Sequence, residues 1–166
     1  IKKIFKNNVS AVKDADIVFI TVPDRFIQEV CDEISLEKGF KRKSIVIHCS
    51  GALDKEILTS AKKNGAFIAS IHPLQTFADE KKVLELMKNT YCFYDCDKEI
   101  LFQITKIIKK LGGGHIKLNK NKEKYHLSAS IASNFFVTLF SLAIKIMSEA
   151  GIDKNTCIKA LLPLID

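Results

Sequence analysis

Short apolar runs rich in β-branched residues alternate with amphipathic segments along most of the chain. Asp16–Val22 is one such run, closed by Pro23, and it is typical of a strand buried on both faces of a parallel sheet. From Phe26 the apolar positions recur at helical spacing until Gly39, which predicts a helix. Further strands are predicted at Ser44–Cys49, Ala66–Ile71, Thr90–Tyr94 and His115–Leu118, and further helices at Asp54–Asn64, from near Thr76 and at Ile100–Leu111. This alternation predicts βαβ units and an α/β fold with a mostly parallel sheet.

The pattern changes after Asn119. No turn signal interrupts residues 121–150, and apolar residues are frequent enough there to predict a long helix buried over most of its circumference. A glycine ends this helix, and Asp153 opens another. We therefore expect residues 1–119 to form an α/β domain and residues 120–166 to begin an all-helical one, with the chain cut at both ends.

Composition and charge exclude several classes of protein. The chain has 166 residues, of which 26 are Lys or Arg and 19 are Asp or Glu, and its formal net charge is +7. The lysines are dispersed rather than gathered in a stripe, which argues against binding to nucleic acid. They also interrupt the apolar runs, so no stretch is expected to span a membrane, and no secretory signal opens the chain. We expect a cytoplasmic protein with neither nucleic acid nor membrane as a partner.

The five cysteines are odd in number and lie within apolar patterns, which predicts buried free thiols. Cys92 and Cys96 lack two further ligands at zinc-type spacing. We expect no metal site. Metal-dependent chemistry is kept only as an alternative, at His48, Cys49, His72 and His126.

Three predicted strands end in chemically distinctive residues. These segments are Val22-Pro23-Asp24, His48-Cys49-Ser50-Gly51 and Ile71-His72-Pro73-Leu74-Gln75. In an open α/β sheet ligands bind outside the carboxyl ends of the strands, so the three segments together predict a binding edge. Each segment by itself is also ordinary turn chemistry, and that alternative stays open.

The Ser50-Gly51 pair is suited to a flat ring, because glycine lacks a Cβ and serine offers a hydroxyl to a carboxamide or phosphate. A nicotinamide would fit this pair. The chain lacks the G-x-G-x-x-G loop that cradles a pyrophosphate between a strand and a helix. Gly112-Gly113-Gly114 follows a helix and is interpreted as a helix stop. The residues alone therefore leave cofactor binding open.

A stripe of polar residues follows one face of the predicted long helix, namely His126, Ser130, Asn134, Thr138, Ser141 and Lys145. From His126 to Ser141 the stripe contains neither Lys nor Glu, which is unusual for the solvent face of a lysine-rich chain. A cleft or interface, a solvated face and a buried, hydrogen-bonded histidine all stay open as interpretations.

Four motifs carry a resemblance to a known family. They are HCSGAL (His48–Leu53), SIHPLQTF (Ser70–Phe77), YHLSASIASNFFV (Tyr125–Val137) and ALLPL (Ala160–Leu164). In these motifs the chain resembles a family, assigned to the oxidoreductases, that pairs a Rossmann-like domain with a helical domain of unknown function, number 2520. Its relatives are pyrroline-5-carboxylate reductase, ketopantoate reductase and the β-hydroxyacid dehydrogenases. The resemblance implies NADP or NAD as cofactor and a helical substrate domain like the C-terminal domain of 6-phosphogluconate dehydrogenase, completed by homodimerisation.

The resemblance also implies roles for individual residues. Val22, Pro23 and Asp24 would lie beside the adenosine and pyrophosphate, Ser50 and Gly51 beside the nicotinamide, and His72, Pro73 and Gln75 at the junction with the substrate pocket. His126, Ser130 and Asn134 would face the substrate. In β-hydroxyacid dehydrogenases the equivalent helix carries a catalytic Lys four residues before an Asn, whereas here Ser130 stands four before Asn134. His126 is therefore the expected proton donor or acceptor.

Two functions from different classes follow. The leading hypothesis is an NAD(P)-dependent oxidoreductase, in which a hydride passes between nicotinamide C4 and a small C=O, C=N or CHOH substrate. The alternative is a noncatalytic protein of the same fold that binds a nucleotide or metabolite as a regulator or scaffold, and the missing lysine favours it.

Overall fold

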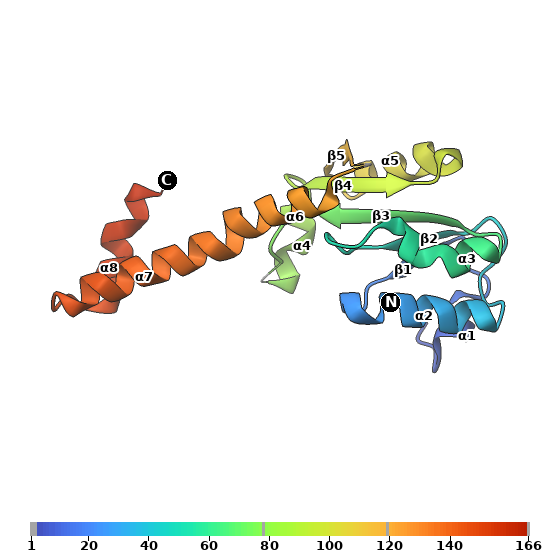
Figure 1. Cartoon of the computed structure of the whole chain (residues 1–166), viewed down its shortest axis with the longest axis horizontal. Coiled ribbons are helices and arrows are strands. Elements are labelled where there is room, and N and C mark those ends of the chain that lie inside the picture. Colours follow the sequence, from blue (N-terminus) through green and yellow to red (C-terminus); the bar gives the residue numbers. More distant parts are fainter. Residues whose placement is uncertain (1–2, 78, 119, 166) are drawn as a thin grey trace. The chain divides into compact units, whose positions relative to one another are not determined.

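The computed structural model of the chain describes residues 3–77, 79–118 and 120–165. Contacts divide the chain into two compact units, Ile1–Lys122 and Glu123–Asp166. The first unit contains the sheet, and the second is helical (Figure 1).

The first unit is built on a five-stranded sheet whose spatial order follows the chain, β1-β2-β3-β4-β5. Its strands are β1 (Ile17–Ile20), β2 (Ile45–His48), β3 (Phe67–Pro73), β4 (Tyr91–Cys96) and β5 (Gly114–Lys117). β1, β2 and β3 pair in parallel, β4 is antiparallel to β3, and β5 is parallel to β4. The predicted α/β class, the mostly parallel sheet and each predicted strand are confirmed.

Helices cover both faces of this sheet. The helices are α1 (Asn8–Val12), α2 (Asp24–Leu36), α3 (Thr59–Lys63), α4 (Val83–Met87) and α5 (Leu101–Lys110). Side chains of α1, α2 and α3 enter one hydrophobic core, and those of α4 and α5 enter the other. Successive residues of a strand point to opposite faces, so Val46 lies in the first core and Ile47 in the second. Both faces of the sheet are therefore buried.

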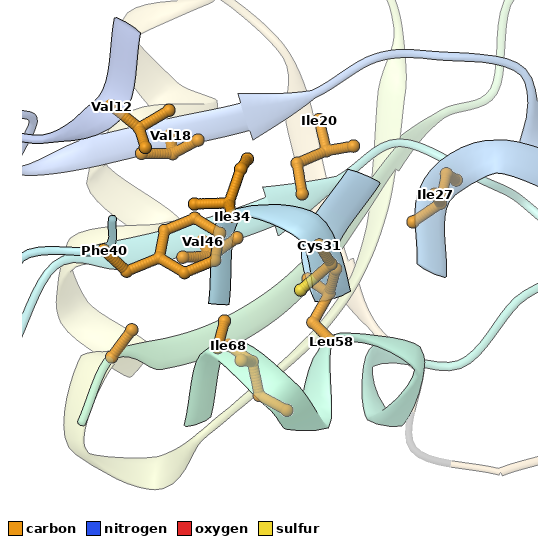
Figure 2. Close-up of a cluster of buried hydrophobic side chains, with 12 residues drawn as sticks. Val12, Val18, Ile20, Ile27, Cys31, Ile34, Phe40, Val46, Leu58 and Ile68 are labelled. Carbon is orange, nitrogen blue, oxygen red and sulfur yellow. The ribbon is translucent and has the colours of Figure 1, made fainter. Parts of the chain in front are cut away.

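Figure 2 shows the first of these cores, in which α2 contributes Ile27, Cys31 and Ile34. These positions recur at helical spacing, as the sequence predicts, and all three side chains are at most 2% exposed. They pack with the side chains of Val18 and Ile20 from β1.

Two predicted helices take a different form. The segment predicted as one helix from Asp54 to Asn64 begins as a 3-10 turn, η1 (Lys55–Leu58), before α3 follows. The helix predicted from near Thr76 begins only with the 3-10 turn η2 (Glu80–Lys82), which leads into α4, so that starting point was wrong. Asp79 caps the turn instead, because its carboxylate accepts the backbone N–H of Lys81 at 2.9 Å. A further 3-10 turn, η3 (Lys98–Ile100), precedes α5.

The second unit consists of one long helical run and a shorter helix. The run comprises α6 (Lys122–Ser130), whose first residue belongs to the first unit, a π-helical segment η4 (Ile131–Phe135) and α7 (Phe136–Glu149). Beyond it lie α8 (Lys154–Leu161) and a 3-10 turn η5 (Leu162–Leu164). The Asp153 carboxylate accepts the N–H groups of Asn155 and Thr156, which confirms the predicted helix start.

The long helical run is more exposed and more apolar than its sequence pattern predicts. No described side chain of α7 is buried, so the predicted burial around its circumference is not found. The segment Lys122–Glu149 is 28 residues long, and an 18-residue stretch within it has a mean hydropathy of 1.7. By length and composition alone, this helix could cross a membrane. The expectation that no stretch reaches this limit was wrong. Core helices of soluble proteins pass the same test, because they too are apolar around most of their circumference.

Burial within α5 predicts a strong contrast between two neighbouring side chains. Ile104 is 0% exposed and Phe102 is 73% exposed. Ile104→Ala should lower the free energy of unfolding by about 2–5 kcal/mol, because it leaves a cavity in the second core. Phe102→Ala removes a larger side chain but should cost less than about 1 kcal/mol. Urea unfolding of both variants measures this, and equal losses would show that α5 is rotated relative to the sheet.

Candidate functional site

The segments that follow β1, β2 and β3 meet at one edge of the sheet. The register sets Ile20, His48 and Ser70 side by side, so the three strands end in the same direction. The Ser50 hydroxyl donates to Asp24 Oδ2 at 2.6 Å and joins the segments after β2 and β1. Gly51 lies against the ring of His72 and joins the segments after β2 and β3. The predicted convergence of these strand ends on one edge is confirmed.

Ser50 organises the loop in which it lies. Its side chain is buried, and its Oγ accepts the backbone N–H groups of Ala52 at 3.2 Å and Leu53 at 3.1 Å while it donates to Asp24. A hydroxyl has one hydrogen to donate and two lone pairs, and all of them are used here. Ser50 therefore shapes the turn and links it to the first residue of α2, and its expected contact with a nicotinamide stays a prediction.

His48 is held as a neutral imidazole at the end of β2. It is 0% exposed, its Nε2 lies 3.2 Å from the carbonyl oxygen of Asp54, and its Nδ1 accepts the N–H of Ser50 at 3.2 Å. These partners require a proton on Nε2 and a lone pair on Nδ1. Burial, followed by the nearby positive charge of Lys122, lowers the pKa of His48 to about 4. At neutral pH the ring is an uncharged brace between β2 and the loop.

Gly51 and His72 form a close contact at this edge. A Cβ at Gly51 would lie 2.7 Å from His72 Cε1 and 2.9 Å from Nε2, so the ring occupies the space that any other residue would fill. Gly51 is buried, whereas His72 and Pro73 are half-buried. Glycine is thus required at position 51 because the backbone there approaches the imidazole ring of His72 closely.

The other residues expected to bind the cofactor lie on the same edge. Val22 is half-buried and packs against the first core, and Pro23 and Asp24 are exposed at the start of α2. Gln75 lies beyond β3, where its Nε2 donates to Thr90 Oγ1 at 3.3 Å. Gln75 is therefore engaged with the segment just before β4.

Lys122 belongs to the same site, although no motif in the sequence singles it out. It is 9% exposed, and its Nζ donates to the carbonyl oxygen of Leu53 and to Ser70 Oγ, the latter at 3.1 Å. Burial lowers the pKa of Lys122. In a lysine-rich chain nothing in the local pattern marks this lysine, because its burial arises from contacts with residues distant in sequence.

A row of polar side chains crosses the sheet beneath Lys122. His48, Ser70 and Asp95 occupy neighbouring register positions on β2, β3 and β4. Asp95 is paired with Lys55 at 2.5 Å. The face that carries the first core thus becomes polar toward the edge where the loops meet.

No metal-binding group is found among the described residues, which contain no cluster of three or more His, Cys, Asp or Glu side chains. His48 has both ring nitrogens engaged with backbone groups. Burial raises the pKa of Cys49 to about 11, so this thiol is protonated at neutral pH. The alternative of metal chemistry at these residues gains no support.

The expected substrate-facing residues lie in the second unit. His126 is exposed on α6, Ser130 is half-buried at the end of α6, and Asn134 is exposed within the π-helical segment. Such segments are rare and occur frequently at functional sites. The sequence predicts an unbroken helix here and gives no sign of the irregularity.

Each half of the chain matches a known domain family. Residues 2–73 match the Rossmann-like domain, and residues 90–166 match a domain of unknown function, DUF2520. The chain thus joins a segment that matches the Rossmann-like domain to a segment that matches DUF2520. None of the curated proteins compared with the sequence matches it.

Solved structures share the fold of this chain. A Thermotoga maritima protein is 34% identical, with a TM-score of 0.71 over 87% of this chain and 54% of its own. A candidate NADP oxidoreductase from Bacteroides fragilis is 19% identical, with a TM-score of 0.72 over 92% of this chain and 55% of its own. Pyrroline carboxylate reductase from Plasmodium falciparum, solved with NADP bound, is 12% identical, with a TM-score of 0.63 over 97% of this chain and 59% of its own. The chain thus spans little more than half the length of these relatives.

His72 and Pro73 are half-buried at this edge of the Rossmann-like domain. The Cβ-free side of Gly51 is occupied by the His72 ring, so the glycine makes room for that ring. The chain contains no G-x-G-x-x-G loop for the pyrophosphate. The nicotinamide end of a dinucleotide bound at this edge would meet His72 and Pro73, and the phosphates are not provided for by a glycine loop of this sequence.

The neutral state of His48 makes folding sensitive to acid. The unfolded chain protonates this histidine near pH 6.5, whereas the folded chain does so near pH 4. The unfolded state therefore binds more protons than the folded state between these two pH values. The contribution of His48 to the free energy of unfolding is fully present above about pH 6.5 and is lost as the pH falls toward about 4. Between pH 7 and pH 5 the wild-type protein should lose about 2 kcal/mol more than His48→Gln, which keeps a donor and an acceptor but does not titrate.

Urea unfolding of both proteins at each pH measures this difference. Because other groups titrate in both, the difference between the two proteins isolates residue 48. Parallel losses would show that His48 is not held neutral.

Proposed function

We propose that this chain is the nicotinamide-binding and substrate-binding portion of an NAD(P)-dependent oxidoreductase. The observation that carries the proposal is the joining of three strand-end segments at one edge by the Ser50–Asp24 hydrogen bond and the Gly51–His72 contact. Ligands of open α/β sheets bind at this edge. The DUF2520 assignment and the fold shared with oxidoreductases support the same conclusion.

The residues of the edge divide into two groups in this proposal. Ser50, His48 and Asp24 are engaged with one another or with the loop backbone, so they shape the surface. His72 and Pro73 supply the surface against which a ring would pack, Gly51 leaves the space that the His72 ring occupies, and in this proposal Val22 and Pro23 extend the surface toward α2. Nicotinamide supplies or accepts a hydride in such enzymes. We propose NADP or NAD as the cofactor.

The proton that accompanies hydride transfer is assigned to His126 in this proposal. Its imidazole is exposed on α6, and histidine is the side chain that most often serves as a general acid or base. Ser130 and Asn134 would orient the substrate by hydrogen bonds. A small C=O, C=N or CHOH compound is the proposed substrate, and a cyclic imine is one member of this class, as the shared fold with pyrroline carboxylate reductase suggests.

The exposed apolar surface of the second unit supports a homodimer as part of the proposal. The side chains of Phe136, Val137, Leu139, Leu142 and Ile146 are all more than 40% exposed on α7. An exposed apolar surface of this extent marks a site of association with another surface. A cytoplasmic location follows the oxidoreductase assignment and is proposed with it.

Binding of NADPH to the full-length protein tests the cofactor proposal. Gly51→Val should weaken binding at least about tenfold, because the new Cβ would displace the His72 ring from the surface that would meet the nicotinamide. The test therefore includes His72→Ala, which removes the ring, and the double variant, in which the valine has room. His72→Ala should weaken binding by a similar factor, and the double variant should bind no more weakly than His72→Ala.

Fluorescence titration measures these affinities, and a thermal melt checks that each variant is folded. Wild-type affinity in a folded His72→Ala or double variant would show that the His72 ring does not contact the nicotinamide. No binding of NADPH or NADH by the wild-type protein would refute the cofactor proposal. Binding without turnover would instead favour the noncatalytic regulator or scaffold.

Substitution of His126 tests catalysis separately. His126→Ala should lower turnover by about 10²-fold, the usual scale for a positioned acid or base. Its melting temperature should change little because the side chain is exposed. Lys124→Ala, an exposed neighbour on α6, is the matched control and should retain activity.

NADPH oxidation with small cyclic imines and 2-keto acids as hydride acceptors provides the assay. A folded His126→Ala variant that keeps its specific activity would remove this residue from the site.

A further inference from the structure

Lys122 is buried and lies within the described part of the chain, and the proposed reaction does not use it. Its side chain is largely withdrawn from water, and within the described residues no carboxylate oxygen forms a salt bridge with it. Fully buried lysines are rare unless they are paired, because removing an ammonium from water is costly. Two neutral oxygens, Leu53 O and Ser70 Oγ, receive its N–H groups instead.

These two oxygens connect the loop after β2 with the middle of β3. Ser70 belongs to β3 and is 1% exposed, so it is a fixed point of the sheet. Leu53 belongs to the loop that begins with Ser50 and Gly51. Through Lys122 the carbonyl group of this loop is therefore tied to the sheet.

The same loop is held by two other side chains, and each engages a different backbone group. Ser50 Oγ accepts the N–H groups of Ala52 and Leu53, and His48 Nε2 donates to the carbonyl oxygen of Asp54. Lys122 holds the carbonyl oxygen of Leu53, which neither of them reaches. The peptide group before Leu53 is thus engaged by Ser50 from within the loop, and the peptide group after it is engaged by Lys122 from outside the loop.

An apolar side chain of similar length would fill this space without the cost of burying a charge. Replacing buried charged groups by hydrophobic ones is often neutral or stabilising. The ammonium is therefore better explained by the geometry that it imposes on the loop than by a contribution to stability.

We propose that Lys122 is a positioning residue that fixes the loop Ser50–Asp54 in the conformation that receives the nicotinamide nucleotide. The proposal rests on the proposed function for its ligand. The loop geometry that it explains does not depend on any ligand. Lys122 acts through Leu53 and Ser70 and is not assigned a contact with cofactor or substrate.

The experiment compares Lys122→Met and Ser70→Ala with Lys124→Met in the full-length protein. Lys122→Met keeps the length of the side chain and removes its donors, and Ser70→Ala removes only the anchor on β3. Lys124 is exposed on the same helix and serves as the matched control. Amide hydrogen exchange without nucleotide is measured in the loop 50–54 and, as an internal reference for global stability, in α5.

We expect Lys122→Met to exchange at least about tenfold faster in the loop while α5 is unchanged, and Ser70→Ala to show a smaller effect in the same direction. NADPH affinity should fall about tenfold in Lys122→Met and remain at the wild-type value in Lys124→Met. Faster exchange in α5 to the same extent as in the loop would mean a merely structural role and would overturn the proposal.

Unchanged loop exchange in a folded Lys122→Met variant would also overturn it. If the loop loosens but a wild-type protein that binds NADPH keeps its affinity after the substitution, Lys122 does not position the loop for this ligand, and the proposal fails. If the wild-type protein binds no nicotinamide nucleotide, the proposed function fails first, and the exchange data alone then decide whether Lys122 holds the loop.

Discussion

In-register parallel pairing of β1, β2 and β3 is the constraint on which the rest of the structure depends. Because Ile20, His48 and Ser70 are neighbours, every segment that leaves these strands does so at one edge. Parallel pairing also requires long connections, and those between β1, β2 and β3 return as α2 and α3 over one face of the sheet. The first hydrophobic core, the direction of α2 and the meeting of the three segments all follow from this one register.

The two ends of β2 differ in how polar groups are treated. At its carboxyl end, His48 and Ser50 are each engaged with at least two partners, although both are buried. At its amino end lies Ser44, whose Oγ is buried without a hydrogen-bond partner among the described residues. Buried polar networks restrict a segment to one conformation only when they are satisfied. The carboxyl edge therefore has the fixed geometry that a binding surface requires.

Sequence reasoning succeeded where a local pattern carries the information. The β-branched run Asp16–Val22 contains β1, and the recurring Ile27, Cys31 and Ile34 mark the buried face of α2. Parallel strands then bring their ends together by topology alone, so the edge could be anticipated from Ser50 and His72.

It failed where two local signals compete or where distant contacts decide the outcome. The turn η2, which leads into α4, is capped by Asp79, and Thr76 offers an equally plausible signal in the sequence. The π-helical segment Ile131–Phe135 has the same apolar spacing as an ordinary helix. Lys122 is one lysine among many, and its partners Leu53 and Ser70 lie far from it in the chain. Neither its burial nor its role could be deduced from its neighbours.

The contact between Gly51 and His72 has a consequence for how this edge can vary in evolution. Since a Cβ at position 51 would fall within 2.7 Å of the imidazole, the two positions share a single volume. A lineage that enlarges residue 51 must shrink or redirect residue 72, and one that replaces His72 by a small residue leaves a hollow open to the edge. Substitution at either position therefore changes the shape of this edge, and we expect the two positions to vary together.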